Sequence, residues 1–285
     1  MKNLKIGIQK SGRLNEDSIK LLKTCGISIN NGRDQLKVSA SNFPLEIYYL
    51  RNGDLPQYLK DGVIDCAILG DNLLVEKGDT IKTQMELGFS KCRVSLAIPR
   101  SETYNSIKDF EGKKIATSYP NTVNKFLKKH GISADIHIIS GSVEIAPNIG
   151  LADGICDIVS SGSTLFKNNL KEVEVLLKSQ AVLAVSPLIA LEHQQILDKL
   201  SFRIEAVLKA KTSKYILMNV PDENIEHVVK LLPGMKSPTI MPLNEKGWSS
   251  VHTVIDENDF WEVIDQLKAA GAEGILVAPI EKMIL

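Results

Sequence analysis

Two ten-residue segments of this chain follow the same pattern. Asp61 to Gly70 reads DGVIDCAILG and Asp153 to Gly162 reads DGICDIVSSG, so each is Asp-Gly-x-x-Asp-x-x-x-x-Gly with apolar residues between the fixed positions. In each segment we expect the second Asp to begin a strand and the last Gly to end it. A chance match is one explanation. A βαβ unit built twice, once in each of two related lobes, explains the match better and predicts a clamshell with its cleft at the strand ends.

The second segment runs into Ser160 to Thr164, a series of small residues (SSGST). We expect Ile155 to Val159 to be a strand and this series to be the loop at its C-terminal end, where ligands bind in open α/β sheets. Backbone N–H groups and hydroxyls without bulky side chains suit a phosphate. An ordinary strand-to-helix turn is the alternative. Two acids, Glu144 and Asp157, flank the loop and offer carboxylates to sugar hydroxyls.

The N-terminus shows a second strand, loop and helix. Leu4 to Gln9 alternates as a strand does, Lys10 to Arg13 (KSGR) is a basic loop, and Glu16 to Cys25 has helical periodicity. This arrangement suits an anion but is equally compatible with a plain βα turn. Arg51 follows another expected strand and adds a further cation at a strand end.

An aromatic residue occupies a third loop of this kind. Lys113 to Thr117 is expected as a strand, and the sequence SYPNT leads from it into a helix that runs through His130. Tyr119 in this loop either stacks on a base or covers the core, and the sequence does not separate the two possibilities.

The last part of the chain changes pattern after a long amphipathic helix, Glu192 to Lys211. The expected elements that follow are strands at Tyr215–Val220, Pro238–Pro242, Ser249–Ile255 and Gly274–Ala278, with helices at Glu223–Leu232 (ended by Pro233 and Gly234) and Asp259–Ala270. This βαββαβ order is ferredoxin-like. Its sequence holds no evident nucleophile or acid/base pair, so we expect a regulatory or oligomerising domain.

Composition excludes several classes of function. The 285 residues include 34 Lys and Arg and 34 Asp and Glu, so no basic field favours nucleic acid or membrane as a partner. No signal peptide or membrane-spanning run is evident, and we expect a cytoplasmic protein. The cysteines are widely spaced, and we expect reduced thiols and no metal ligands at Cys25, Cys66, Cys92 and Cys156.

The familiar catalytic motifs are also missing. The sequence has no Gly-x-Ser-x-Gly elbow, His-Glu-x-x-His pair, Walker loop or Gly-x-Gly-x-x-Gly, and its His residues stand alone. Two acids beside a phosphate-sized loop suit a phosphorylated sugar. Basic residues across the cleft could take a second polyphosphate. Such a site favours transfer at an anomeric carbon, because positioning and charge stabilisation supply most of that catalysis.

The segment from Glu144 to Leu165 resembles the signature of the ATP phosphoribosyltransferase family, which begins histidine biosynthesis. The matching positions are Glu144, Gly150, Ala152, Ile155, Asp157, Ser161-Gly162 and Thr164-Leu165. The runs QKSGRL, IATSYP, SPTI and ILVAPIEKM are similar to the same family, so the resemblance covers nearly the whole chain. The βαββαβ tail resembles that of the long form, which needs no separate regulatory subunit.

This resemblance implies an α/β fold with a two-lobed, periplasmic-binding-protein-like catalytic core and a C-terminal ferredoxin-like (ACT/PII-like) domain. We expect residues 1–95 and 180–208 to form the first lobe, 96–179 the second, and 212–285 the histidine-binding regulatory domain. The implied assembly is a homo-oligomer, from dimer to hexamer, without nucleic-acid or membrane partners. A non-enzymatic two-lobed ligand-binding or sensor protein is the alternative.

The resemblance also implies the chemistry. ATP condenses with 5-phosphoribosyl 1-pyrophosphate (PRPP) to give N1-(5-phosphoribosyl)-ATP and pyrophosphate, with Mg²⁺ as cofactor and histidine as feedback inhibitor. The chain lacks an adjacent pair of acids before the loop, so we expect Mg²⁺ to be held mainly through pyrophosphate, and we identify no general base. The implied site residues are Glu144, Asp157, Ser160, Ser161, Gly162, Ser163 and Thr164 for PRPP, Lys10, Arg13 and Arg51 for pyrophosphate or ATP phosphates, Tyr119, Asp71 and Asn72 for adenine or ribose, and Asn219 and Thr239 for histidine.

Overall fold

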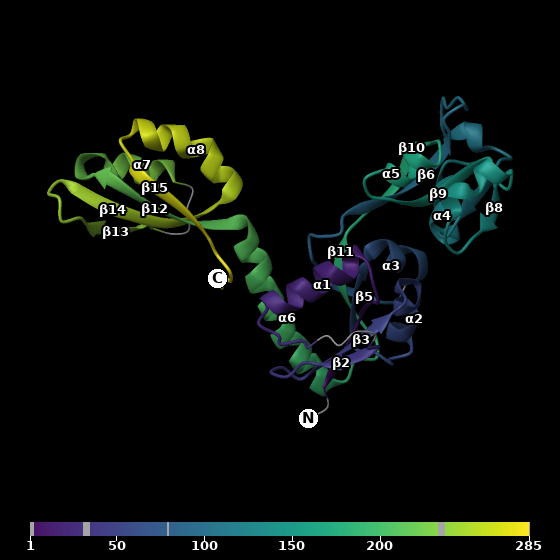
Figure 1. The fold of residues 1–285 in the computed structure, drawn as a ribbon, viewed down its shortest axis with the longest axis horizontal. Coiled ribbons are helices and arrows are strands. Elements are labelled where there is room, and N and C mark those ends of the chain that lie inside the picture. Colours follow the sequence, from purple (N-terminus) through teal and green to yellow (C-terminus); the bar gives the residue numbers. More distant parts are fainter. Residues whose placement is uncertain (1–2, 31–34, 79, 233–236, 285) are drawn as a thin grey trace. The chain divides into compact units, whose positions relative to one another are not determined.

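The structure is a computed structural model that describes residues 3–30, 35–78, 80–232 and 237–284 (Figure 1). The chain divides into two compact units. The first comprises Met1–Lys23 and Ile27–Leu197, and the second comprises Thr24–Gly26 and Asp198–Leu285. Two sheets belong to the first unit and one to the second. None of the described helices is long and apolar enough to cross a membrane.

The first sheet has the strand order β2-β3-β1-β4-β11-β5. Its strands are β1 (Leu4–Gln9), β2 (Lys37–Ser39), β3 (Leu45–Leu50), β4 (Cys66–Gly70), β5 (Lys82–Glu86) and β11 (Ala181–Val185), and its helices are α1 (Arg13–Thr24), α2 (Leu55–Lys60) and α3 (Asp71–Lys77). β1 pairs in parallel with β3 and β4. Parallel strands are covered on both faces, which explains why β4 is almost entirely apolar and buried. We call this sheet with α1 to α3 the first lobe.

The second sheet has the order β10-β6-β9-β7-β8. It is formed by β6 (Cys92–Pro99), β7 (Lys114–Thr117), β8 (Asp135–Ile138), β9 (Gly154–Val159) and β10 (Leu170–Ser179), with helices α4 (Pro120–Lys129) and α5 (Ser163–Lys167). Read from β8, this order repeats β3-β1-β4-β11-β5 of the first sheet, with the same parallel and antiparallel pairings. We call this sheet with α4 and α5 the second lobe. The predicted two-lobed α/β fold is confirmed.

The repeated sequence pattern does not keep its strand register. In the first copy Gly70 ends β4, as predicted, but the strand begins at Cys66, one residue after Asp65. In the second copy β9 already begins at Gly154, so the prediction that Asp157 begins the strand is wrong. Gly154 can start the strand because it lacks a side chain: a Cβ there would lie 3.0 Å from the Ala97 carbonyl oxygen. Asp157 therefore lies inside β9, and Gly162 lies beyond its end.

Two chain crossings join the lobes. Residues 87–91 connect β5 to β6, and Gln180 connects β10 to β11. The sequence predicts strands at Val173–Leu177 and Ala181–Val185 that both return the chain to the first lobe, but β10 pairs with β6 in the second sheet and only β11 returns. The prediction failed because β10 and β11 are separated by a single residue, so the sequence shows no break between the two sheets.

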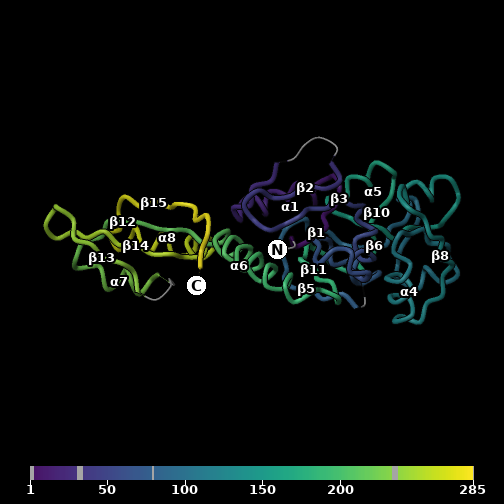
Figure 2. Tube along the Cα trace, turned by 90° about the horizontal axis from the view of Figure 1, so that it is seen from below, coloured from purple at the N-terminus to yellow at the C-terminus, as the bar shows by residue number. Residues whose placement is uncertain are grey.

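The second unit contains most of α6 (Leu191–Thr212), which follows β11 along the chain and is one continuous helix (Figure 2). The following elements are β12 (Ser213–Pro221), α7 (Ile225–Leu231), β13 (Thr239–Pro242), β14 (Trp248–Asp256), α8 (Glu257–Ala269) and β15 (Glu273–Pro279). Their sheet order, β13-β14-β12-β15, confirms the ferredoxin-like prediction. Met218, Val251 and Leu267 are fully buried where α7 and α8 cover one face. The helix end expected at Pro233 and Gly234 lies outside the described residues.

Candidate active site

The predicted phosphate loop lies at the C-terminal end of β9. Ser160 to Gly162 form a turn, and Ser163 begins α5. Gly162 has a φ of 79°, a left-handed conformation that glycine adopts without the steric penalty of a side chain. The Ser161 hydroxyl donates to the Ser163 hydroxyl at 3.0 Å and accepts from the Ser163 N–H at 3.4 Å. The loop is therefore a tight turn with hydrogen bonds between its own residues, and its exposed side chains are small and carry hydroxyl groups.

Asp157 and Glu144 lie close enough to influence each other. Asp157 is half-buried on β9, and Glu144 is in the short helical turn Val143–Ile145. Burial raises the pKa of Asp157, and the negative charge of Glu144 raises it further, whereas a hydrogen bond from the Ile158 N–H at 2.8 Å opposes both effects. Two carboxylates beside a turn of N–H and hydroxyl groups suit a ligand that carries both hydroxyls and a phosphate.

The basic residues of the first lobe come from adjacent strand ends. The Lys10 N–H donates to the Leu50 carbonyl at 2.8 Å, so Lys10 lies beside the end of β3, where Arg51 follows. Arg13 lines a pocket of about 190 Å³ that also contains Asn52 of the first lobe and Ser160 of the second. The structure thus places Arg13 and the start of the phosphate loop on one pocket.

Tyr119 and Asn72 join the two lobes to each other. The Asn72 amide donates to the Tyr119 hydroxyl at 2.9 Å, and both residues are buried. The Ser179 hydroxyl donates to Asn72 Oδ1 at 2.9 Å. Burial raises the pKa of Tyr119, and the negative charge of Asp157 raises it further. In this arrangement Tyr119 belongs to the core, and its contact with adenine stays a prediction. Asp71 lies nearby, where it accepts a hydrogen bond from the Gln180 N–H at 3.2 Å.

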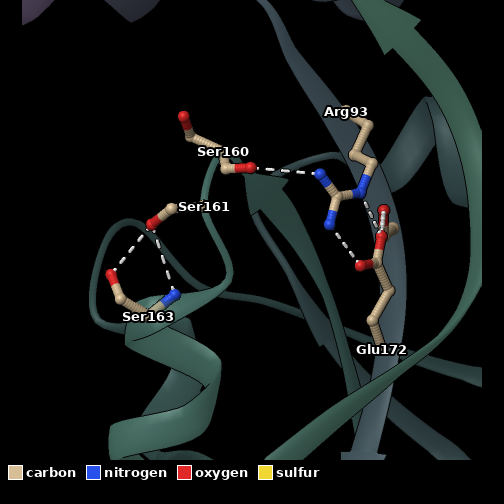
Figure 3. A network of polar contacts seen from close by, with 6 residues as sticks. Arg93, Ser160, Ser161, Ser163 and Glu172 are labelled. Carbon is tan, nitrogen blue, oxygen red and sulfur yellow. Dashed lines mark hydrogen bonds and ion pairs between the residues drawn. The ribbon is translucent and has the colours of Figure 1, made fainter.

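Sequence reasoning missed a second polar network, which contacts the phosphate loop (Figure 3). Arg93 at the start of β6 forms a bidentate pair with Glu172 of β10, and Arg93 also donates to the Ser160 carbonyl at 3.1 Å. The Ser95 hydroxyl donates to Glu172 at 2.7 Å. Arg93 and Glu172 are 79 residues apart, so no local pattern pairs them.

In the second unit, Asn219 and Thr239 share the sheet face that α7 and α8 leave open. Asn219 is opposite Ser250, and Thr239 is opposite His252, two residues further along β14. Side chains two residues apart on a strand point to the same face. The His252 ring lies within hydrogen-bond distance of Tyr215 (2.6 Å) and Ser250 (3.0 Å) on this face. In the sequence His252 stands alone, and only the pairing of β12 with β14 shows these partners.

The described residues offer no preformed metal site: no group of three or more His, Cys, Asp or Glu side chains is arranged as one. All four cysteines are free thiols, and three of them are buried. Burial raises the pKa of Cys25 to about 11 and also raises that of Cys92, so these groups are protonated at neutral pH.

Sequence comparison finds relatives along the whole chain. The profile described as HisG, ATP phosphoribosyltransferase, matches residues 51–206, and the one described as HisG, C-terminal domain, matches residues 210–282. A protein named ATP phosphoribosyltransferase from Cytophaga hutchinsonii is 56% identical over 281 residues, 99% of this chain and 98% of that one. One with the same name from Phocaeicola vulgatus is 54% identical, over 99% of this chain and all of that one.

Structural comparison gives a consistent result. The structure titled ATP phosphoribosyl transferase (HisG:HisZ) complex from Thermotoga maritima is similar with a TM-score of 0.62 at 28% identity, over 72% of this chain and 98% of that one. A putative L-cystine ABC transporter from Listeria monocytogenes has a TM-score of 0.50 at 16% identity, over 73% of this chain and 93% of that one, and shows a shared fold only. With relatives above 50% identity over nearly its full length, the chain belongs to the ATP phosphoribosyltransferase family.

Proposed function

We propose that this protein transfers the phosphoribosyl group of PRPP to N1 of the adenine of ATP. The observation that carries this proposal is the combination of Asp157 on β9, the neighbouring Glu144 and the Ser160–Thr164 turn at the end of β9, in a chain of this family. The turn supplies N–H and hydroxyl donors for the 5-phosphate, and the carboxylates accept hydrogen bonds from the ribose hydroxyls.

In the proposed reaction the adenine N1 lone pair forms a bond to the anomeric carbon of PRPP. The bond from that carbon to the pyrophosphate oxygen breaks, and its electron pair leaves with pyrophosphate. Positive charge develops on the ribose in such a transfer, so the ionised carboxylates of Asp157 and Glu144 stabilise it electrostatically. N1 carries no proton to remove, and the reaction therefore needs no general base.

Lys10, Arg13 and Arg51 are the proposed partners of pyrophosphate or of the ATP phosphates. Their support is the position of Lys10 and Arg51 at adjacent strand ends and of Arg13 on a pocket with Ser160. Mg²⁺, when bound, neutralises charge on the leaving pyrophosphate. A donor set limited to the carboxylates of Asp157 and Glu144, without a group of three in the described part of the chain, suits an ion that takes most of its ligands from phosphate oxygens and water.

The C-terminal domain is proposed to bind histidine on the open sheet face that carries Asn219 and Thr239. Inhibition then requires histidine to favour one arrangement of the catalytic lobes or subunits over another. The similarity to the Thermotoga maritima structure covers 98% of that chain but 72% of this one. This chain also matches the HisG C-terminal domain, at residues 210–282. This supports regulation within the chain, without a separate subunit. A cytoplasmic homo-oligomer, from dimer to hexamer, remains part of the proposal.

The test is direct. Incubation with ATP, PRPP, Mg²⁺ and pyrophosphatase is expected to produce the ultraviolet absorbance of N1-alkylated adenine. Asp157→Asn is expected to abolish most of this turnover while histidine still binds. If PRPP binds but no such product forms, the proposal fails. A two-lobed binding protein without catalysis, the second candidate, has only the shared fold in its favour.

A further inference from the structure

Arg93 connects three structural elements with one side chain. Its Nε and one terminal nitrogen bind both carboxylate oxygens of Glu172 on β10, and its other terminal nitrogen donates to the Ser160 carbonyl. The Ser95 hydroxyl supports the same carboxylate from the next position on that face of β6. Figure 3 shows the guanidinium between the carboxylate and the first residue of the phosphate loop.

Glu172 fixes the plane of the guanidinium. A bidentate pair sets both the position and the orientation of the arginine fork, which a single hydrogen bond does not. The hydrogen bond to Glu172 raises the pKa of Arg93, and the one from Arg93 lowers the pKa of Glu172, so both remain charged at neutral pH. With two donors used by Glu172, the direction of the remaining terminal nitrogen toward Ser160 is determined.

The orientation of the Ser160 carbonyl determines the next N–H group. In a planar trans peptide the C=O and the N–H point in opposite directions, and the Ser160 carbonyl shares its peptide plane with the Ser161 N–H. A carbonyl turned toward Arg93 therefore turns the Ser161 N–H away from Arg93. The Ser161 N–H is the first backbone donor of the turn, which continues through Gly162 to Ser163 at the start of α5.

We infer that Arg93 is a positioning residue for PRPP: oriented by Glu172, it holds the Ser160 carbonyl and thereby aims the Ser161 N–H at the 5-phosphate. This inference rests on the proposed function. The ion pair is partly exposed, so its own contribution to stability is small. Its effect is instead on the geometry of the loop.

The chain offers a matched control. Glu46 accepts from Lys37 at 3.0 Å and from the Tyr48 hydroxyl at 3.0 Å, so it also combines a cation and a hydroxyl as partners on a partly exposed sheet position. It lies on the first sheet, on strand β3. Glu46→Gln therefore removes a similar interaction without any connection to the phosphate loop.

The experiment compares the full chain with Arg93→Lys, Glu172→Gln, the double variant and Glu46→Gln. Arg93→Lys keeps the charge but lacks the fork, so the KM for PRPP should rise about tenfold, as for the loss of a charge-assisted hydrogen bond, while the KM for ATP stays unchanged. Glu172→Gln should act in the same direction, and the double variant should be no worse than Arg93→Lys, because Glu172 acts through Arg93. Glu46→Gln should leave both constants unchanged.

An unchanged KM for PRPP in folded Arg93→Lys, or equal rises for PRPP and ATP, would overturn the inference. If Arg93→Lys does not fold, Glu172→Gln decides by the same two constants. Additive effects in the double variant would refute the role of Glu172. Failure of the proposed function is a separate result, since it shows as no turnover by the unmodified protein.

Discussion

Glu76 of the first lobe caps the first turn of α4 in the second lobe through Thr122. One carboxylate oxygen accepts from the Thr122 N–H at 2.8 Å and from its hydroxyl at 2.7 Å, and the other accepts from the Asn121 N–H at 2.9 Å. Glu76 is only 4% exposed. The start of a helix has unsatisfied N–H groups, so this carboxylate serves as a cap supplied by the opposite lobe.

Replacing this cap should destabilise the first unit. In Glu76→Gln one oxygen becomes an NH₂ group that cannot accept, which leaves a buried donor of α4 without its partner. The expected cost is about 1–3 kcal/mol of unfolding free energy, measured by urea denaturation. The exposed Glu102 provides the control, since Glu102→Gln should change stability little. Equal stability of the two variants would show that the cap contributes nothing.

Asp157→Asn should raise thermal stability while it removes activity. Because burial and Glu144 raise the pKa of Asp157, its ionised form costs the folded state free energy. This cost is absent below the unfolded Asp pKa of about 3.9 and grows as the pH rises toward the raised folded value. The melting temperature of Asp157→Asn at pH 7 should therefore exceed that of the unmodified chain.

A variant with the opposite expected change in melting temperature, Asp109→Asn, checks this interpretation. Hydrogen bonds from the Asn105 and Ser106 N–H groups lower the pKa of Asp109. Its stabilising effect is present above the unfolded pKa and is lost as the pH falls through the folded one, so Asp109→Asn should lower the melting temperature at pH 7. If both variants shifted the melting temperature in the same direction, the conclusion that ionised Asp157 destabilises the folded state would be wrong.

PRPP affinity should depend on the ionisation of Asp157. The neutral acid is a poorer acceptor for ribose hydroxyls, so affinity should fall as the pH drops through the raised pKa of Asp157, at a higher pH than for an ordinary Asp. Calorimetric titration of PRPP at several pH values measures this, and Asp157→Asn corrects for titration of the ligand. A pH profile shared by the variant and the unmodified chain would contradict the prediction.

Gly162→Ala should raise the KM for PRPP, whereas the same substitution at Gly150, outside the phosphate loop, should not. Gly162 and Gly150 have φ values of 79° and 73°, and an added Cβ would meet no atom within 4 Å at either position. Both alanine variants should therefore cost about 1–2 kcal/mol of backbone strain. Only Gly162 lies in the phosphate loop, so only its variant should raise the KM for PRPP. Equal rises in the KM for PRPP in both variants would contradict a specific role of the Ser160–Thr164 loop in PRPP binding.

Thr239→Ala should reduce inhibition by histidine without changing uninhibited turnover. Thr239 lies on the open face of the C-terminal sheet with Asn219, and α7 and α8 cover the opposite face. Losing one hydrogen bond should raise the histidine concentration for half-inhibition about fivefold to tenfold. Val254, on the same face of β14, provides the control as Val254→Ala. Unaltered inhibition in Thr239→Ala would place histidine elsewhere.

Sequence patterns predicted most elements because their signals are local. The sequence predicts a strand at Leu4–Gln9 and a short helix at Leu55–Lys60, and β1 and α2 have these bounds. β1 alternates in hydrophobicity, and α2 has proline in its first turn, where helices tolerate it. β5 (KTQME) was missed because it is polar and largely exposed, so it has no buried face to produce alternation. α3 was missed because it begins at Asp71, directly after the strand that ends in Gly70.

The candidate site was predictable only in part for the same reason. The loop at Ser160 is contiguous in sequence, and a pattern of small residues identifies it. The Arg93–Glu172 pair is not contiguous, and β10 has register shifts on both sides of Glu174 that no periodic count reproduces. Contacts between lobes, such as Glu76 with Thr122, likewise depend on tertiary packing.

The repeated strand order has a consequence for folding order. The second sheet uses one continuous stretch, from Cys92 to Ser179. The first sheet places β11 between β4 and β5, and β11 follows the whole second lobe in the chain. During synthesis the second lobe therefore possesses all its strands before the first lobe does, so the N-terminal β-sheet is expected to be completed after the sheet of the second lobe.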